Sequence, residues 1–221
     1  MRIFNADGSE AKMCGNGIRC VGKFLYDNKL VNSKSIKIDT LSGVKNVEVC
    51  ESQGKKSVLR VDMGKPMFSP ECVPVNLAGD KIISRDVIIK NKQYNINCVS
   101  IGNPHCVIFC DDVMSEDINS ASVQIEQGGL FPDGVNVEFV RIDDDKNISL
   151  RVHERGSGET LACGTGACAA VVAAVENGMC KKGEDIKVKL CGGELVIKYD
   201  TDGSIYMTGP AEEVFKGEIE I

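Results

Sequence analysis

Hydrophobic and polar residues alternate one by one through much of this chain, which is the pattern of half-buried β-strands. The alternating stretches fill most of the sequence outside two glycine-rich segments. We predict strands or β-rich stretches at 2–4, 35–49, 58–63, 86–89, 93–99, 106–110, 134–142, 149–153 and 185–199. Residues 209–221 alternate in the same way and predict one more strand at the C-terminus.

Two stretches break this alternation and repeat their apolar residues with helical spacing. In the stretch 17–30, one side of the predicted helix carries Ile18, Val21, Phe24 and Leu25. In the stretch 166–176, the run ACAAVVAAVE is apolar on nearly every side. A helix of that kind is best placed inside a fold rather than on its surface.

The chain also repeats its own order of elements. Shifted by 149 residues, the segment RIFNADGSEAKMCGNG falls on RVHERGSGETLACGTG, so that Cys14 falls on Cys163. One more residue of shift places IKIDTLSG on IKVKLCGG. In both copies a short strand enters a glycine-containing loop, a Cys-Gly-x-Gly turn opens a helix, and a β-rich stretch follows.

From this repeat we predict an α+β fold of two pseudo-symmetric half-domains, each with a β-sheet or barrel wrapped around a central helix. The first half-domain would comprise 1–58 and 209–221, and the second 59–208. A long β-rich stretch precedes the second Cys-Gly-x-Gly turn, whereas little precedes the first. We therefore expect the first half-domain to lack its opening strands and the chain to be truncated at its N-terminus.

The composition argues against several classes of partner. The chain has 26 lysine and arginine residues against 32 aspartate and glutamate residues, and its net charge of −6 disfavours nucleic acid and anionic membrane surfaces. No apolar run approaches the roughly 18 residues of a membrane span. The first residues, MRIFNADGSE, contain no apolar signal core. We expect a cytoplasmic protein with neither a nucleic-acid nor a membrane partner.

The eleven cysteines are interpreted as reduced thiols, because a disulfide framework is typical of shorter chains that carry an export signal. Most of them would pack as small apolar residues. This interpretation applies to Cys50, Cys72, Cys98, Cys106, Cys110, Cys180 and Cys191. Cys14 and Cys163 differ, because each directly precedes a glycine turn at the start of a predicted helix.

A Cys-Gly-x-Gly turn at a helix start suits acid–base chemistry. Unpaired backbone N–H groups and the positive end of the helix dipole can hold a carboxylate. The same field lowers the pKa of a neighbouring thiol. Two such turns on one cleft would set a sulfur on each face of a planar carbon, so that one thiolate removes a proton while the opposite thiol delivers one. Such chemistry inverts a stereocentre and needs no pyridoxal cofactor.

Other interpretations of the turns stay open on the residues alone. A structural zinc site could use Cys14, Cys20, Cys163 and Cys168, although their spacings are not C-x-x-C. Cys14 and Cys163 could instead form a disulfide. The glycine turns could also bind phosphate with incidental cysteines, although no P-loop spacing occurs in the chain.

The segments FNADGSEAKMCGNGIRC and ERGSGETLACGTGACAA resemble the two signature segments of the diaminopimelate epimerase family. Proline and hydroxyproline racemases also use two cysteines. Their first motif has a histidine where this chain has Asn16, and their second motif lacks the ERGSGET lead-in. The resemblance implies interconversion of LL- and meso-diaminopimelate, on the route to lysine, without a cofactor or a metal.

The resemblance also implies roles for individual residues. Cys14 and Cys163 fall on the two acid–base thiols of the family. The family's substrate-contacting positions fall on Asn5, Gly15, Asn16, Asn103, Asn136, Glu154, Arg155, Gly164 and Thr165. His105 and Glu154 fall on positions that tune the thiols. The expected partner is a small amino-acid substrate, and homodimer formation is left open.

One departure from the family concerns the start of the chain. Family members open with a segment resembling H-G-x-G-N-D-F, which supplies strands and substrate contacts and which this sequence does not show. We expect weak activity or none if the protein begins at Met1. Two alternatives to the epimerase therefore stay open, an inactive truncated family member and a proline- or hydroxyproline-type racemase.

Overall fold

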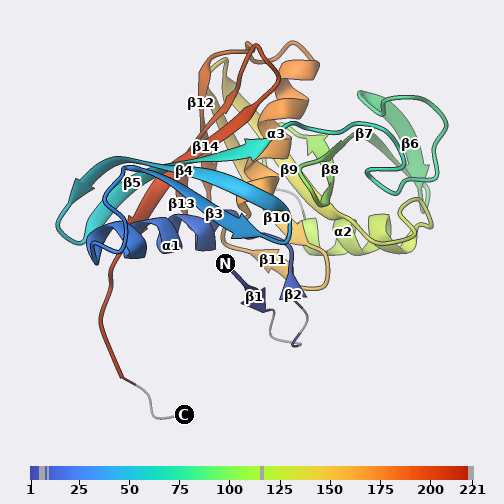
Figure 1. Cartoon of the computed structure of the whole chain (residues 1–221). Helices are drawn as coiled ribbons and strands as arrows, with labels where there is room; N and C mark the ends of the chain where they lie inside the picture. The colour runs from blue at the N-terminus through green and yellow to red at the C-terminus, as the bar shows by residue number, and fades with distance from the viewer. Residues whose placement is uncertain (5–7, 9, 115–116, 219–221) are drawn as a thin grey trace. The chain divides into compact units, whose positions relative to one another are not determined.

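The fold is mixed α+β, as the sequence predicts (Figure 1). It comes from a computed structural model, which describes residues 1–4, 8, 10–114 and 117–218. Three helices and fourteen strands lie within these residues. Contacts between residues divide the chain into two compact units: a first unit of Met1–Asp62 with Met207–Ile221, and a second unit of Met63–Tyr206.

The first unit places one helix against a small sheet. Its main strands follow the order β3 (Ser35–Thr40), β4 (Gly43–Gln53), β5 (Lys56–Gly64) and β14 (Ile205–Glu212). Helix α1 (Gly15–Asp27) lies against β3 and β4 (Figure 1). Two short strands, β1 (Ile3–Phe4) and β2 (Glu10–Ala11), pair antiparallel just before this helix.

The buried side of α1 matches the predicted one only in part, because Ile18 is buried as predicted. Phe24 is 59% exposed, whereas the helix buries a face that carries two cationic side chains. The buried residues of α1 are Gly15, Ile18, Arg19, Gly22 and Lys23. Gly22 lets the sheet approach closely, because a Cβ there would lie 2.9 Å from Val47 Cγ1. The buried ammonium of Lys23 is paired with Asp27 and Ser57. A hydrophobicity pattern counts such residues as surface and so misplaces the face.

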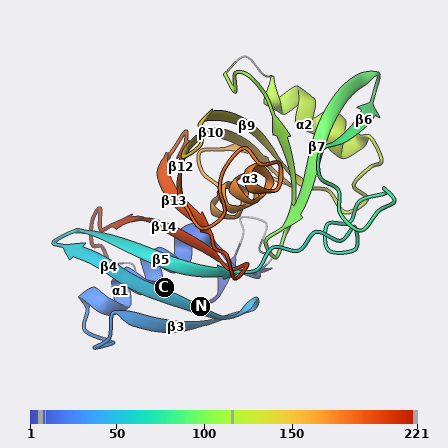
Figure 2. The same ribbon diagram turned by 90° about the horizontal axis from the view of Figure 1, so that it is seen from above.

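The second unit wraps its strands around one helix. They follow the order β13 (Gly193–Tyr199), β12 (Asp185–Leu190), β10 (Asn147–Glu154), β9 (Asn136–Asp144), β8 (Pro104–Phe109), β7 (Lys92–Ser100) and β6 (Arg85–Ile89). A short strand, β11 (Gly158–Thr160), pairs with β10. Figure 2 shows α3 (Gly164–Glu176) nearly end-on with strands around it, and most of its residues are buried. The prediction of an enclosed, apolar second helix is confirmed.

Three sequence-based predictions about elements are incomplete or wrong. The helix α2 (Ile118–Gln127) was not predicted, and it packs through a face that includes Ile118 and Ile125. The C-terminal strand is shorter than predicted, because β14 ends at Glu212 and 213–218 form no strand. Of the cysteines assigned to the core, Cys191 is exposed, because it lies in the turn between β12 and β13.

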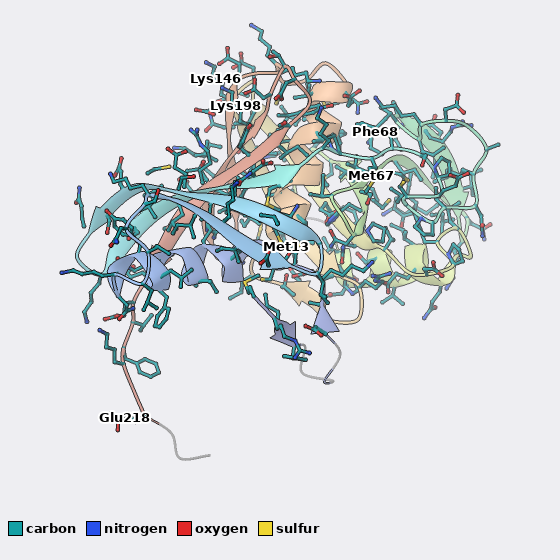
Figure 3. The ribbon with its side chains drawn as sticks, in the orientation of Figure 1. Met13, Met67, Phe68, Lys146, Lys198 and Glu218 are labelled. Carbon is teal, nitrogen blue, oxygen red and sulfur yellow. The ribbon has the colours of Figure 1, made fainter. Side chains whose placement is uncertain are left out.

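The long connection from β5 to β6 is tied down within the second unit. Met67 forms a backbone bridge with Ser100. Figure 3 labels Met67 and Phe68 on this connection. Lys81 Nζ lies 4.0 Å from the centre of the Phe68 ring, and the same ammonium pairs with Glu176 at the end of α3. These contacts hold a segment without regular strands against the element that carries the second cysteine turn.

Candidate active site

The strand pairs that lead into the two cysteines are built alike. β1 with β2 and β10 with β11 pair in registers that match at the offset of the sequence repeat. Arg2 Nε lies 2.8 Å from Glu10 Oε1, and Arg151 Nε lies 2.8 Å from Glu159 Oε1. Each ion pair closes the loop that delivers the chain to a helix start. The repeat seen in the sequence is therefore also a repeat of local structure.

The two cysteine turns, residues 14–17 and 163–166, also share one geometry. Cys14 is the N-cap of α1 and Cys163 is the N-cap of α3, both with extended backbone. Cys14 Sγ accepts a hydrogen bond from Gly17 N at 3.4 Å, and Cys163 Sγ accepts one from Gly166 N at 3.4 Å. Each sulfur thus lies at the positive end of a helix, where a thiolate is stabilised.

The first cysteine turn is supported by an arginine that sequence reasoning missed. Arg19 is only 6% exposed. Its Nη2 donates to Asn16 Oδ1 at 3.1 Å, and its Nη1 donates to Gly15 O at 3.1 Å. A predicted substrate-binding side chain, Asn16, is thereby held by a buried cation one helical turn away. The signal in the sequence is an arginine spaced to fall on the same face of the helix as Gly15.

The second cysteine turn gathers several of the predicted residues into one hydrogen-bonded chain. Thr165 Oγ1 lies 3.4 Å from Cys163 Sγ and accepts a hydrogen bond from Asn103 Nδ2 at 3.3 Å. Asn103 Oδ1 in turn lies 3.0 Å from His105 Nε2. His105 is fully buried. The sequence places these residues on separate strands and turns, and the second unit brings them together.

A buried carboxyl group, Glu138 on β9, extends this chain and was not predicted. Its Oε1 lies 2.6 Å from His105 Nδ1, and its side chain is fully buried. Among the residues that the structure describes, no group hydrogen-bonds to its Oε2. Burial raises the pKa of Glu138, and the neighbouring His105 opposes that rise. An acidic residue inside a fully buried strand is the sequence signal that could have identified it.

The groups around the Cys163 thiol shift its pKa in opposite directions. Burial is the largest cause and raises this pKa above its ordinary value. The carboxyl groups of Glu154 and Glu138 raise it further, while the Thr165 hydroxyl and the Gly166 N–H lower it. The hydrogen-bond donors at the helix start are therefore the groups that favour a thiolate at this position.

The remaining predicted residues around β9 and β10 make contacts of their own. Glu154 Oε1 accepts a hydrogen bond from Thr160 Oγ1 at 2.5 Å. Asn136 is buried, and its Oδ1 accepts from Arg155 N at 2.9 Å. The exposed Arg155 donates through Nη1 to Asp133 O at 2.7 Å. Asn136, which lies on β9, thus holds the turn at residues 154–156 against that strand. The predicted Asn5 lies outside the described residues.

Two of the alternative interpretations of the turns, a disulfide and a structural zinc site, can be compared with the described parts of the chain. All eleven cysteines lie there, and each is a free thiol. Within residues 1–4, 8, 10–114 and 117–218, no group of three or more histidine, cysteine or acidic side chains could hold a metal ion. In the same residues, no helix is long and apolar enough to cross a membrane.

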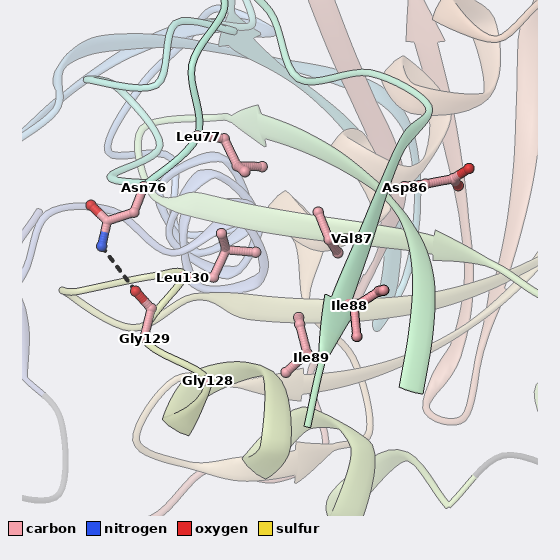
Figure 4. A pocket seen from close by; sticks show the side chains of 9 residues that line it. All are labelled: Asn76, Leu77, Asp86, Val87, Ile88, Ile89, Gly128, Gly129 and Leu130. Carbon is pink, nitrogen blue, oxygen red and sulfur yellow. Dashed lines mark hydrogen bonds between the residues drawn. The ribbon is translucent and has the colours of Figure 1, made fainter. Parts of the chain in front are cut away.

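Two surface pockets of the second unit lie away from the predicted site residues. The pocket in Figure 4, of about 350 Å³, runs beside β6 and is bordered by a hydrogen bond from Asn76 Nδ2 to Gly129 O. The other, of about 450 Å³, is lined by Phe109, Cys110, Asp111, Arg141, Ile142 and Met179. Neither pocket contains a residue that the sequence assigned to catalysis or substrate binding.

Comparison with known proteins identifies close relatives. The family model described as diaminopimelate epimerase matches residues 1–69 and 97–214. A diaminopimelate epimerase of Methanococcus maripaludis is 47% identical over 222 residues, which cover 100% of this chain and 79% of that protein. A diaminopimelate epimerase of Halothermothrix orenii is 48% identical over 223 residues, which cover 100% of this chain and 78% of that protein.

Solved structures share the fold at low sequence identity. A probable proline racemase from Agrobacterium radiobacter matches with a TM-score of 0.70 at 15% identity, over 97% of this chain and 71% of that one. A hydroxyproline epimerase from Agrobacterium vitis matches with a TM-score of 0.70 at 14% identity, over 96% of this chain and 68% of that one. These likenesses concern the fold alone.

Proposed function

Because the chain belongs to the diaminopimelate epimerase family, we propose that it is an isomerase that interconverts LL- and meso-diaminopimelate. The proposal is supported by the family match over most of the chain. It is also supported by relatives of that name at 47% and 48% identity that align with the whole chain. One observation carries the mechanism: two cysteines cap two helices with the same geometry.

In the proposed reaction, Cys14 and Cys163 act as the acid–base pair. The thiolate of one cysteine takes the α-proton, so that an S–H bond forms as the C–H bond breaks. The electron pair stays on the α-carbon and is delocalised into the α-carboxylate. The thiol of the other cysteine then delivers its proton to the opposite face. Each turnover exchanges the protonation states of the two sulfurs, and the proposal involves neither a pyridoxal cofactor nor a metal.

The helix starts would stabilise the charge that develops during this reaction. We assign the N–H groups around Gly15-Asn16 and Gly164-Thr165 to the reacting end of the substrate, because donors at a helix N-terminus favour an anion. The exposed guanidinium of Arg155 suits the distal carboxylate, since its planar fork can bind a carboxylate through two bonds. Asn103, Asn136 and Glu154 are proposed to shape the same site.

The first prediction tests both thiols through solvent exchange. In heavy water, the wild-type protein should introduce deuterium at the α-carbon of LL-diaminopimelate as it epimerises it. Cys14→Ala and Cys163→Ala should each lower the epimerisation rate by about 100-fold or more, because each removes one acid–base group. Mass spectrometry of the recovered amino acid measures deuterium incorporation, and chiral chromatography measures epimerisation.

A matched variant controls for cysteine loss in general. Cys20→Ala removes an exposed thiol from the same helix as Cys14 and should leave the rate within about twofold of wild type. Proline offered in the same assay should stay undeuterated, and its racemisation would instead support a proline-type racemase. Wild-type rates in both active-site variants would rule out the two-thiol mechanism. A folded wild-type protein with no exchange would indicate an inactive family member.

A further inference from the structure

Glu138 is a buried acid with one hydrogen-bonding neighbour. Its Oε1 lies 2.6 Å from His105 Nδ1, and both side chains have no exposed surface. Within the described residues, Oε2 receives no hydrogen bond. A buried carboxylate with an unsatisfied oxygen is costly, so the charged form needs compensation. Among the described side chains, His105 is the one that supplies that compensation by direct contact.

The number of protons that His105 and Glu138 share follows from the contact between His105 and Asn103. The amide oxygen Oδ1 of Asn103 lies 3.0 Å from His105 Nε2 and can only accept a hydrogen bond. His105 Nε2 must therefore carry a proton. One further proton lies between His105 Nδ1 and Glu138 Oε1, because two bare acceptors would repel each other at 2.6 Å. Wherever that second proton sits, the pair as a whole has no net charge.

This arrangement gives the hydrogen-bond chain one direction. His105 Nε2–H donates to Asn103 Oδ1, and Asn103 Nδ2–H donates to Thr165 Oγ1 at 3.3 Å. Because the Thr165 oxygen already accepts a bond, its hydroxyl hydrogen is free to point at Cys163 Sγ, 3.4 Å away. Every donor in the chain then points toward the sulfur. A thiolate at Cys163 is favoured by that polarity.

We propose that Glu138 is a positioning residue for the Cys163 thiol, acting through His105, Asn103 and Thr165. It holds the imidazole through Nδ1 so that the Nε2–H faces Asn103, and the pair of His105 and Glu138 adds no net charge near the sulfur. This inference rests on the proposed function only in taking Cys163 as one of the two acid–base thiols. Glu138 itself touches neither sulfur nor substrate in this scheme.

Other ionisable groups lie around this hydrogen-bond chain, but none of those described below takes over the positioning role of Glu138. Glu154 raises the pKa of both Glu138 and Cys163, which further favours a protonated carboxyl on Glu138. The fully buried Cys106 thiol has its pKa raised well above the ordinary value and stays neutral. At the first cysteine turn, the buried Arg19 holds Asn16.

The second prediction uses two substitutions of Glu138 with opposite expectations. In Glu138→Gln, the amide N–H can donate to His105 Nδ1 as the carboxyl group does, so the chain keeps its direction. In Glu138→Met, an apolar side chain of similar length leaves Nδ1 without a hydrogen-bonding partner, so the imidazole is held through Asn103 alone. Nitrogen-15 NMR of the histidine rings measures the tautomer directly, and His153→Gln assigns the signals because the protein has two histidines.

The expected result has a spectroscopic and a kinetic part. Wild type and Glu138→Gln should both show His105 with a protonated Nε2 and a hydrogen-bonded Nδ1, and Glu138→Met should lose the hydrogen bond at Nδ1. In the epimerisation assay, Glu138→Met should lower kcat by about 10- to 100-fold with little change in KM. Its pH profile should shift to higher pH, because the thiolate loses a donor. Glu138→Gln should stay within about threefold of wild type.

Three outcomes would overturn the inference. They are a wild-type His105 with an unprotonated Nε2, a folded Glu138→Met protein that keeps the wild-type kcat and pH profile, and a Glu138→Gln protein as impaired as Glu138→Met. The NMR measurement needs no substrate. If wild type fails to epimerise diaminopimelate, the proposed function fails, and the Nδ1 signals of wild type and Glu138→Met still decide whether Glu138 holds the imidazole.

Discussion

The glycine at the third helical position of each cysteine turn meets different neighbours in the two copies. A Cβ built on Gly166 would lie 2.8 Å from Glu138 Oε1 and 3.3 Å from Cys163 Cβ. A Cβ built on Gly17 would lie 3.2 Å from Ile3 Cδ1, which is the far end of a flexible side chain. The second turn therefore requires glycine because a buried carboxyl group lies against it, whereas the first turn has room to adapt.

The third prediction compares these two glycines. Gly166→Ala should lower the free energy of unfolding by about 1–2 kcal/mol, because the steric cost of overpacking exceeds the gain in helix propensity. Gly17→Ala should change it by no more than about 0.5 kcal/mol, since Ile3 can move and the helix gains propensity. Urea unfolding followed by circular dichroism measures both. Equal losses in the two variants would contradict the contact with Glu138.

At the scale of single residues, the sequence reveals the reactive residues better than the residues that hold them in place. The repeat locates Cys14 and Cys163 without any structure. Arg19 and Glu138 are harder to find, because a charged residue normally indicates exposed surface, and only their places on a helix face and inside a buried strand distinguish them. Both are buried only because a specific partner satisfies each of them, and that partner lies on another turn or another strand.

At the scale of elements, the helices α1 and α3 begin and end alike but are packed differently. Each starts at a cysteine N-cap and stops at an asparagine, Asn28 or Asn177, whose Nδ2 donates to a carbonyl four residues earlier at 2.8 Å. α3 packs against several strands of the second unit. α1 packs against β3 and β4 along one face, where Gly22 sets the distance.

The fourth prediction tests that close approach of helix and sheet. A Cβ on Gly22 would lie 2.9 Å from Val47 Cγ1 and 3.0 Å from Leu59 Cδ2, and both neighbours are buried. Gly22→Ala should therefore destabilise the protein by about 1–3 kcal/mol. The control Cys20→Ala lies on the exposed side of α1 and should stay within about 0.5 kcal/mol of wild type. Thermal unfolding would separate the two variants.

The strength of each periodic pattern explains which elements could be predicted. The enclosed α3 and the hairpins β3–β4 and β12–β13 follow from long, clear patterns that occur twice. α2 has only short apolar spacing and a polar sequence, INSASVQIEQ, so its helix depends on packing that the pattern does not contain. The alternation in 213–218 has no partner strand among the described residues, and its Val214 and Phe215 are about 80% exposed.

At the scale of the whole chain, the eleven cysteines form three classes of accessibility. Cys20 and Cys191 are exposed. The half-buried thiols are Cys14, Cys50, Cys72 and Cys110. The buried thiols are Cys98, Cys106, Cys163, Cys168 and Cys180. Burial raises the pKa of Cys98 to about 12, so this thiol stays protonated at neutral and mildly alkaline pH. Exposure and pKa therefore both limit which sulfurs can react.

The fifth prediction is a count of reactive thiols in the native protein. At pH 8, a bulky aromatic disulfide reagent should modify Cys20 and Cys191 fastest and the four half-buried thiols more slowly. The buried thiols outside the proposed site, Cys98, Cys106, Cys168 and Cys180, should react only after unfolding. Absorbance gives the count, and mass spectrometry of peptides identifies the sites. Fast modification of Cys98 or Cys106 in the folded protein would contradict the packing of β7 against β8.

The two cysteine turns also have a consequence for the divergence of such proteins. Their backbones are copies of one another, yet an arginine supports one and a histidine–glutamate pair supports the other. Evolution can therefore alter the reactivity of a single sulfur by changing its supporting residue, without rebuilding the helix start that holds it. A duplicated segment in this way supplies two groups of the same shape whose surroundings can change independently.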